Sequence, residues 1–302
     1  MIPRFDYEIR PVGVEGAADL FVVQAAISPV DAGQLLDWTA DIEDRLEHGS
    51  VAWAISAGRR TAGYALIDPL PGLPGVYDLS GGVVPARRRQ GLGDRLLRHV
   101  LAAAGKLGAS QVSCRVERLD DDPADFLLRR GFYVEHGERL LELTDLAGLP
   151  AIPEQPEGRL VSYPQSAAIA EFRRIYDESF TGTAWYQPYS EEEVALLLAR
   201  AEDLLLLEVD GRPVGVVWHE LMPEGTGRIE PIGVVTGRQR QGYGRRLMLA
   251  ALHNLRHRGA SKVQIGLWSE NAAALNLYES LGFLQVEDWY YLAYDLEGLK
   301  GQ

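Results

Sequence analysis

Two turns rich in glycine and arginine contain the residues of this 302-residue chain whose types and spacing most directly suggest chemistry. Arg88–Gly93 reads RRQGLG, and Gln239–Gly244 reads QRQGYG; each run stands between a predicted strand and a predicted helix. The first amides of a helix lack partners within the helix and carry partial positive charge. Glycines let the backbone approach an anion closely. Each turn is therefore predicted to bind a pyrophosphate group.

The turns differ from two common phosphate-binding motifs. No Lys-Ser or Lys-Thr pair follows the glycines, so neither turn is a Walker P-loop. Leu96 and Leu247 stand where the dinucleotide fingerprint has its third glycine. A Gly-x-Gly pair alone is a weak signal. The strand before it, the helix after it and the second copy make it specific.

The chain contains an internal repeat with a constant offset. Gly91 and Gly242 are 242 − 91 = 151 residues apart, and the Gly-Ala-Ser and Gly-Phe pairs that follow recur at the same offset. A period of that length indicates a duplicated domain rather than a solenoid repeat. Residues 149–157 include three prolines and form a predicted linker. The prediction is an N-terminal domain over 1–148 and a C-terminal domain over 158–302.

Hydrophobic periodicity gives both copies a mixture of helices and strands. The second copy predicts a hairpin of two strands around Asp210-Gly211. Its other predicted elements are helices over 169–180, 191–201, 244–258 and 271–281, and strands over 229–235, 262–267 and 289–294. The fold expected from this order is α/β, with a mixed sheet flanked by helices in each copy.

Composition limits the classes of partner. A formal charge of −13 argues against a nucleic-acid binder, because phosphate contacts need a basic surface. The sequence has no run of about 18 apolar residues, which a membrane-spanning helix would need. The single cysteine, Cys114, and the absence of a signal peptide favour a cytoplasmic protein. No Cys/His cluster has metal-ligand spacing, so no metal is expected. The sequence leaves open a monomer or a homodimer.

Two segments resemble the sequence motifs of the GNAT superfamily of N-acetyltransferases. Residues 235–247 are similar to its motif A, whose backbone amides hold the pyrophosphate of acetyl-CoA. Residues 271–283 are similar to its motif B, Asn-x-x-Ala-x-x-Leu-Tyr-x-x-x-Gly-Phe. The resemblance covers nearly the whole chain outside the linker and implies two tandem GNAT domains, each with a mostly antiparallel mixed sheet.

This resemblance implies a set of acetyl-CoA-binding residues. In the C-terminal copy they are Val234, Val235, Arg240, Gln241, Gly242, Tyr243, Gly244, Arg245 and Asn271; in the N-terminal copy they are Val83, Val84, Arg89, Gln90, Gly91, Leu92 and Gly93. Val234 and Val235 would present backbone groups to the acetyl carbonyl and to the pantetheine arm. Asn271 also suits the N-cap of the helix that follows it.

The same resemblance implies that Tyr278 protonates the departing CoA sulfur. Glu230 lies on the strand leading into the phosphate turn, where a carboxylate could take the proton of the acceptor amine. The N-terminal copy has Leu127 and Leu79 at these two positions, and leucine cannot transfer a proton. The C-terminal domain is therefore predicted to be catalytic and the N-terminal domain degenerate.

The reaction implied is direct acetyl transfer from acetyl-CoA to a primary amine, most simply of a small molecule, in a ternary complex. Candidates for the acceptor pocket are Trp185, Tyr186, Tyr189, His219 and Tyr290, because aromatic rings can enclose a cationic group. Three alternatives remain open from the sequence: a non-catalytic acyl-CoA sensor, an acetyltransferase acting on protein lysines or N-termini, and an enzyme using another acyl donor.

Overall fold

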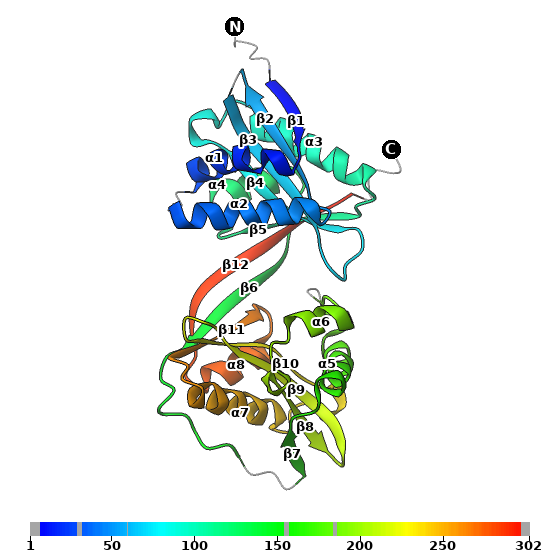
Figure 1. Cartoon of the computed structure of the whole chain (residues 1–302), viewed down its shortest axis with the longest axis vertical. Coiled ribbons are helices and arrows are strands. Elements are labelled where there is room, and N and C mark those ends of the chain that lie inside the picture. Colours follow the sequence, from blue (N-terminus) through cyan, green and yellow to red (C-terminus); the bar gives the residue numbers. More distant parts are fainter. Residues whose placement is uncertain (1–6, 29–31, 59, 154–156, 184–185, 297–302) are drawn as a thin grey trace. The chain divides into compact units, whose positions relative to one another are not determined.

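A computed structural model describes residues 7–28, 32–58, 60–153, 157–183 and 186–296 (Figure 1). Its contacts divide the chain into two compact units. Unit 1 contains residues 1–134 and 291–302, and unit 2 contains residues 135–290.

Unit 1 contains a sheet whose strands run in the order β1-β2-β3-β4-β5, followed by the end of β12. The first four strands pair antiparallel in sequence, and β4 pairs parallel with β5. The strands are β1 (Tyr7–Val12), β2 (Val51–Ala57), β3 (Arg60–Pro69), β4 (Val76–Val83), β5 (Gln111–Val116) and β12 (Leu284–Asp295). The helices are α1 (Ala17–Ile27), α2 (Ala32–Glu47), α3 (Leu92–Lys106) and α4 (Asp122–Leu128).

Unit 2 has the same arrangement of strands as unit 1. Its strands run in the order β7-β8-β9-β10-β11, followed by β6. Again the first four strands pair antiparallel, and β10 pairs parallel with β11. The strands are β6 (Tyr133–Leu143), β7 (Gly158–Val161), β8 (Leu204–Val209), β9 (Arg212–Leu221), β10 (Thr226–Val234) and β11 (Lys262–Trp268). The helices are α5 (Gln165–Phe180), α6 (Glu191–Leu197), α7 (Tyr243–His257) and α8 (Ala272–Glu279).

The α/β fold class is confirmed, and the local signals of the sequence explain it. Ser190 and Glu193 form a capping box at the start of α6. Gly108 and Gly259 take left-handed φ angles of 87° and 93° just after α3 and α7, as helix-terminating glycines do. The predicted helices appear as α5 to α8, although α6 ends at Leu197 rather than at residue 201.

The last strand of each repeat crosses from one unit into the other. In sequence, β6 closes the first repeat, yet its residues from Glu135 onward belong to unit 2, where Leu143 to Glu138 pair antiparallel with β11. The last strand of the second repeat, β12, ends in unit 1, where Leu296 N donates to Ser110 O at 2.7 Å. The repeat and the packing units therefore divide the chain at different places. The predicted domain limits describe the repeat and stay a prediction.

One irregularity distinguishes β10 from its counterpart β4. The pairing of β10 with β9 shifts by one residue between Ile229 and Ile232, which marks a β-bulge, and Glu230-Pro231 is a cis peptide. The pairing of β4 with β3 keeps one register from Gly63 to Pro69. Pairing of β10 with β11 is recorded only from Thr226 to Arg228, so the bulge stands just beyond the paired part of the strand.

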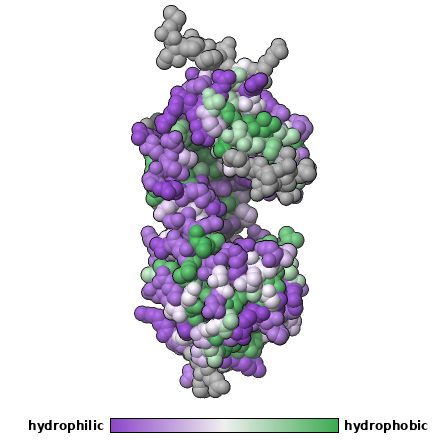
Figure 2. Space-filling view, turned by 90° about the vertical axis from the view of Figure 1, so that its left-hand side faces the viewer, coloured by the Kyte–Doolittle hydropathy of each residue, from purple (hydrophilic) through white to green (hydrophobic). Residues whose placement is uncertain are grey.

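The core of unit 2 lies between the sheet and its helices. The apolar stripe of α7, including Leu247, Leu252 and Leu255, has no exposed surface and packs against the sheet. On α5, Phe172 is fully buried beside Trp218 of β9. Much of the surface seen in Figure 2 is polar, with apolar patches between. Within the described residues, no helix is long and apolar enough to cross a membrane.

Candidate active site

The phosphate turn of unit 2 leads directly into α7. Arg240 and Gly242 both take left-handed conformations, with φ angles of 58° and 84°. Gly242 is the N-cap residue, and no side chain caps the helix there. Gln239 Nε2 donates to Val234 O at 3.0 Å, which fixes the turn against the end of β10. No side chain therefore caps the start of α7, and the binding of an anion there stays a prediction.

The neighbouring candidates of this turn have varied surroundings. Both backbone groups of Val235 are paired, since its N–H donates to Val214 O and its C=O accepts from Arg238 N. Tyr243 is buried at the first position of α7. Arg245 donates to Ser280 Oγ at 2.9 Å. Gln241 follows Arg240 in the turn.

The turn of unit 1 has the same backbone but more crowded surroundings. Arg89 and Gly91 take φ angles of 59° and 80°. A Cβ added to Gly93 would lie 3.2 Å from the ring of Phe126, whereas one added to Gly244 would lie 3.8 Å from Leu277. The Arg89 guanidinium is paired with Asp122 at 3.2 Å. An aromatic ring and a carboxylate therefore stand beside this turn.

The remaining candidates of unit 1 lie at the end of β4 and the start of α3, as their counterparts lie at the end of β10 and the start of α7 in unit 2. Val84 N donates to Ala62 O, as Val235 N does in unit 2. Val83 accepts from Arg88 Nε at 3.1 Å. Leu92 is buried at the start of α3, and Gln90 Nε2 donates weakly to Ala86 O at 3.5 Å.

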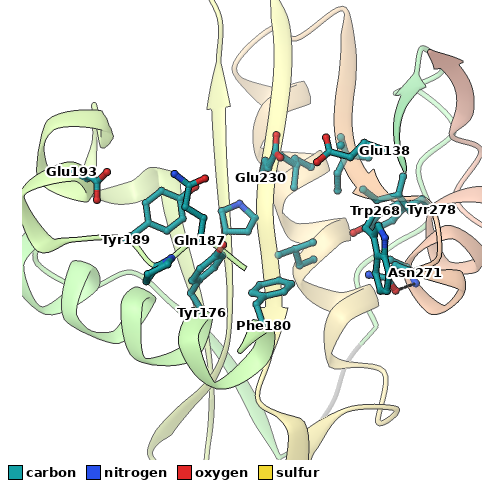
Figure 3. Close-up of a pocket in the computed structure, with 18 residues that line it drawn as sticks. Glu138, Tyr176, Phe180, Gln187, Tyr189, Glu193, Glu230, Trp268, Asn271 and Tyr278 are labelled. Carbon is teal, nitrogen blue, oxygen red and sulfur yellow. Dashed lines mark hydrogen bonds between the residues drawn. The ribbon is translucent and has the colours of Figure 1, made fainter. Parts of the chain in front are cut away.

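A cleft of about 300 Å³ lies in unit 2 where β10 and β11 stop pairing (Figure 3). The β10 bulge, the end of β11, the start of α8, the end of α5 and the segment before α6 surround it. Its lining residues are Glu138, Tyr176, Phe180, Gln187, Pro188, Tyr189, Glu193, Ile229, Glu230, Pro231, Ile232, Ile265, Gly266, Leu267, Trp268, Asn271, Ala274 and Tyr278. Four of the sequence candidates share this space: Tyr189, Glu230, Asn271 and Tyr278.

Tyr278 reaches the cleft from the last turn of α8. Its side chain is nearly buried, and its ring packs 5.9 Å from that of Phe283. Burial raises the pKa of the Tyr278 hydroxyl, and the nearby Glu230 carboxylate raises it further. The group is therefore a neutral phenol at neutral pH, able to donate a proton.

Asn271 and Trp268 lie beside Tyr278 in the cleft (Figure 3). Asn271 Oδ1 accepts from Ala274 N at 3.1 Å, so the expected N-cap is present. Trp268 Nε1 is buried and has no hydrogen-bond partner among the described residues. An unpaired buried donor costs roughly 1–3 kcal/mol, so its presence in a cleft favours a ligand that accepts its hydrogen bond.

Glu230 projects from the β10 bulge into the same cleft, with 47% of its side chain exposed. Partial burial against the cleft walls removes some of the water around the carboxylate and raises its pKa. Arg228 Nη2, 3.3 Å from Glu230 Oε2, lowers that pKa, and Glu138 raises it. A carboxylate with a raised pKa is a better proton acceptor near neutral pH.

Several lining residues were not predicted from the sequence, because they come from segments that the motifs do not include. Glu138 lies on β6 of the first repeat and pairs with Trp268 in the sheet register. Tyr176 and Phe180 come from α5, and their rings are 4.8 Å apart. The aromatic spacing of α5 is the one signal in the sequence that points to this wall.

The candidates for the acceptor pocket are mostly placed elsewhere. Of those described, only Tyr189 lines the cleft, with its ring 5.0 Å from that of Tyr176. Tyr186 donates to Asp177 at 2.7 Å and packs against Tyr176 from outside the lining.

Two further candidates lie outside the lining, and one lies outside the described residues. His219 is fully buried, and its pKa is lowered by burial, so it is a neutral core residue. Tyr290 packs against Gly137. Trp185 falls in a segment that the structure does not describe.

Comparison with known sequences adds family information to this geometry. The profile of the acetyltransferase (GNAT) family matches residues 19–132 and again residues 169–283. A mycothiol acetyltransferase of Nocardia farcinica is 30% identical over 238 residues, covering 74% of this chain and 75% of that protein. A mycothiol acetyltransferase of Thermomonospora curvata is 33% identical over 239 residues, covering 74% and 75%.

Solved structures share the fold. A GCN5-related N-acetyltransferase from Sphaerobacter thermophilus aligns with a TM-score of 0.74 at 17% identity, covering 98% of this chain and 97% of that one. A tandem GNAT protein from the clavulanic acid biosynthesis pathway aligns with a TM-score of 0.63 at 19% identity, covering 96% and 99%. At such identities the likeness concerns the fold alone.

Proposed function

Since the chain belongs to the acetyltransferase (GNAT) family, and is an acyltransferase with that family's domain in tandem, we propose that unit 2 transfers acetyl from acetyl-CoA to the primary amine of a small molecule. The observation that carries the proposal is the cleft in which Glu230 and Tyr278 meet. One can accept a proton and the other can donate one.

The residues of unit 2 fit acetyl-CoA as the donor. The uncapped start of α7, with left-handed Arg240 and Gly242 before it, suits a pyrophosphate. The unpaired Trp268 Nε1 suits a carbonyl oxygen of an extended arm reaching into the cleft. Acetyl-CoA supplies an acetyl group activated as a thioester.

Glu230 acts first in the proposed mechanism. At neutral pH an alkylammonium, with a pKa of roughly 10.4, has no free lone pair. The Glu230 carboxylate takes one proton from the acceptor, directly or through water. The amine nitrogen then forms its bond to the acetyl carbonyl carbon as the carbon–sulfur bond breaks.

Tyr278 acts at the leaving group. Its phenol gives a proton to the departing sulfur, which leaves as a thiol. The nitrogen loses its second proton as the amide forms, and that proton restores the phenol. The overall reaction converts an ammonium and acetyl-CoA into an acetamide, CoA and one proton, so charge and atoms balance.

A small acceptor is favoured over a protein by two observations. The relatives of about 30% identity carry the name of a small molecule, mycothiol. The cleft of about 300 Å³ matches a small-molecule site. Tyr176, Phe180 and Tyr189 give it an aromatic wall.

Unit 1 is assigned a non-catalytic role. It has Leu127 where unit 2 has Tyr278, and Phe126 and Asp122 stand beside its phosphate turn. A carboxylate beside the turn repels the phosphates of CoA, and the ring reduces the space for them.

Calorimetric titration with acetyl-CoA, together with thiol release in the presence of amines, tests the proposal. One binding site per chain and thiol release that requires an amine are expected. If acetyl-CoA binds but no amine causes thiol release, the result would favour an acyl-CoA sensor. Release with succinyl- or malonyl-CoA in preference to acetyl-CoA would change the assigned donor.

A further inference from the structure

The cleft of unit 2 carries a carboxylate that the second repeat does not encode. Glu138 lies on β6, the last strand of the first repeat, yet it lines the cleft with Glu230 and Tyr278. Figure 3 shows Glu138 and Glu230 next to each other, between Tyr189 and Tyr278. They are close enough for Glu138 to raise the pKa of Glu230.

The strand that carries Glu138 is firmly attached to unit 2. Six consecutive residues of β6, Glu138 to Leu143, pair with β11. Glu142 accepts hydrogen bonds from Lys262 Nζ and Gln264 Nε2, both at 2.8 Å. Ser269 N donates to Gly137 O at 2.8 Å, one residue before Glu138. The position of Glu138 in the cleft is therefore set by the sheet.

The lining of the cleft is strongly acidic. Glu138, Glu193 and Glu230 line it, and none of its described lining residues is a lysine or an arginine. Two cationic groups stand behind these carboxylates. Arg228 is 3.3 Å from Glu230, and His136, with a pKa raised to about 9 by Glu135 and Glu138 against its burial, is 3.5 Å from Glu138. Because three carboxylates face only two cationic groups, the net charge around the cleft is negative.

We infer that Glu138 selects the acceptor: it favours amines whose neighbouring groups are uncharged and disfavours amines that carry a carboxylate or phosphate beside the amine. The inference rests on the proposed function. An ammonium is attracted by both carboxylates, and an anion attached next to it is repelled by the same pair. One unit charge at about 6 Å, with an effective dielectric constant of about 40 between that of a protein surface and that of water, changes affinity by roughly tenfold.

The test compares pairs of acceptors that differ in an anionic group beside the amine, with kcat/KM calculated per unprotonated amine. Alaninamide and alanine form one pair, and ethanolamine and phosphoethanolamine form another. For the unaltered chain, kcat/KM for the uncharged member is expected to exceed that for the anionic member at least tenfold. The Glu138→Gln variant should reduce that ratio about fivefold to tenfold, mainly through KM, and Glu138→Asp should keep most of it.

Two further measurements separate selection from a structural effect. Glu142→Gln removes the same charge from the same strand outside the lining, keeps an oxygen that can accept from Lys262 and removes no partner of His136, so it should leave the ratio unchanged. Because Glu138 raises the pKa of Glu230, Glu138→Gln should move the acidic limb of the pH–rate profile to lower pH. Calorimetric titration of both members of a pair in the presence of CoA gives the same preference without turnover.

The outcomes are distinct. If the unaltered chain acetylates amines but treats both members of each pair alike, the inference is overturned and the proposed function stands. If Glu138→Gln slows both members equally without moving the pH profile, Glu138 has only a structural role. If no amine of the panel is acetylated, the proposed function fails, and the inference fails with it.

Discussion

Glu138 of β6 lies opposite Trp268 of β11 in the antiparallel register, and both side chains line the cleft of unit 2. The first of these residues belongs to the first repeat and the second to the second repeat. The proposed active site is therefore assembled from both copies of the duplicated sequence, although its catalytic pair, Glu230 and Tyr278, comes from one of them.

Replacing Tyr278 by phenylalanine should lower kcat by about 10²–10³-fold, because the departing sulfur loses its proton donor while the ring keeps its packing. Acetyl-CoA affinity, measured by calorimetry, should stay within about twofold of the original. Tyr163→Phe is the matched control, since Tyr163 bonds to Glu208 away from the cleft lining. An equal loss of kcat in both variants would remove Tyr278 from the mechanism.

Replacing Glu230 by glutamine should lower kcat/KM at neutral pH by about 10²-fold and remove the acidic limb of the pH–rate profile. Arg228→Gln should keep that limb and move it to higher pH. The guanidinium lowers the pKa of Glu230, so its removal raises the pKa and moves the limb to higher pH. A profile that is unchanged in Glu230→Gln would mean that another group takes the proton.

The two phosphate turns offer a matched pair of substitutions, because Gly91 and Gly242 have nearly the same φ, 80° and 84°. Valine at either position is strained by roughly 1–3 kcal/mol. Gly242→Val should weaken acetyl-CoA binding at least about 50-fold, and Gly91→Val should leave it unchanged. Loss of half of the binding stoichiometry in Gly91→Val would instead assign a second CoA site to unit 1.

Because β6 pairs with β11 of unit 2, we expect truncation on either side of β6 to have different effects on stability. A fragment over 135–302 retains β6 as the partner of β11, whereas a fragment over 158–302, which follows the repeat, leaves β11 with an unpaired edge. The longer fragment should unfold cooperatively in urea at a clearly higher midpoint. Equal midpoints for the two fragments would show that β6 adds nothing to the stability of unit 2.

Phe172 should be a main contributor to the stability of unit 2. It has no exposed surface, and its ring lies 5.4 Å from that of Trp218 and 5.5 Å from that of Tyr189. Phe172→Ala should lower the free energy of unfolding by about 3–5 kcal/mol, measured by urea denaturation. A loss below about 1 kcal/mol would mean that the neighbouring rings collapse into the space.

Local sequence signals determined much of this protein. The phosphate turns, the capping box at Ser190 and the N-cap at Asn271 depend on residues within a few positions of one another. Helical and strand periodicity depends only on which face of an element is apolar. The constant offset of 151 residues predicted a duplicated domain, the order of its elements predicted the α/β class, and motif B pointed to Tyr278.

Only the tertiary structure decided which residues share the cleft and which strands complete each unit. No local rule makes β6 pair with β11 instead of β5, because both choices satisfy the same backbone hydrogen bonds. Glu138 therefore could not be assigned to the cleft from its sequence position. Similarly, His219 and Tyr189 are both polar aromatic candidates in sequence, and only the packing around β9 and α5 buries one and leaves the other facing the cleft.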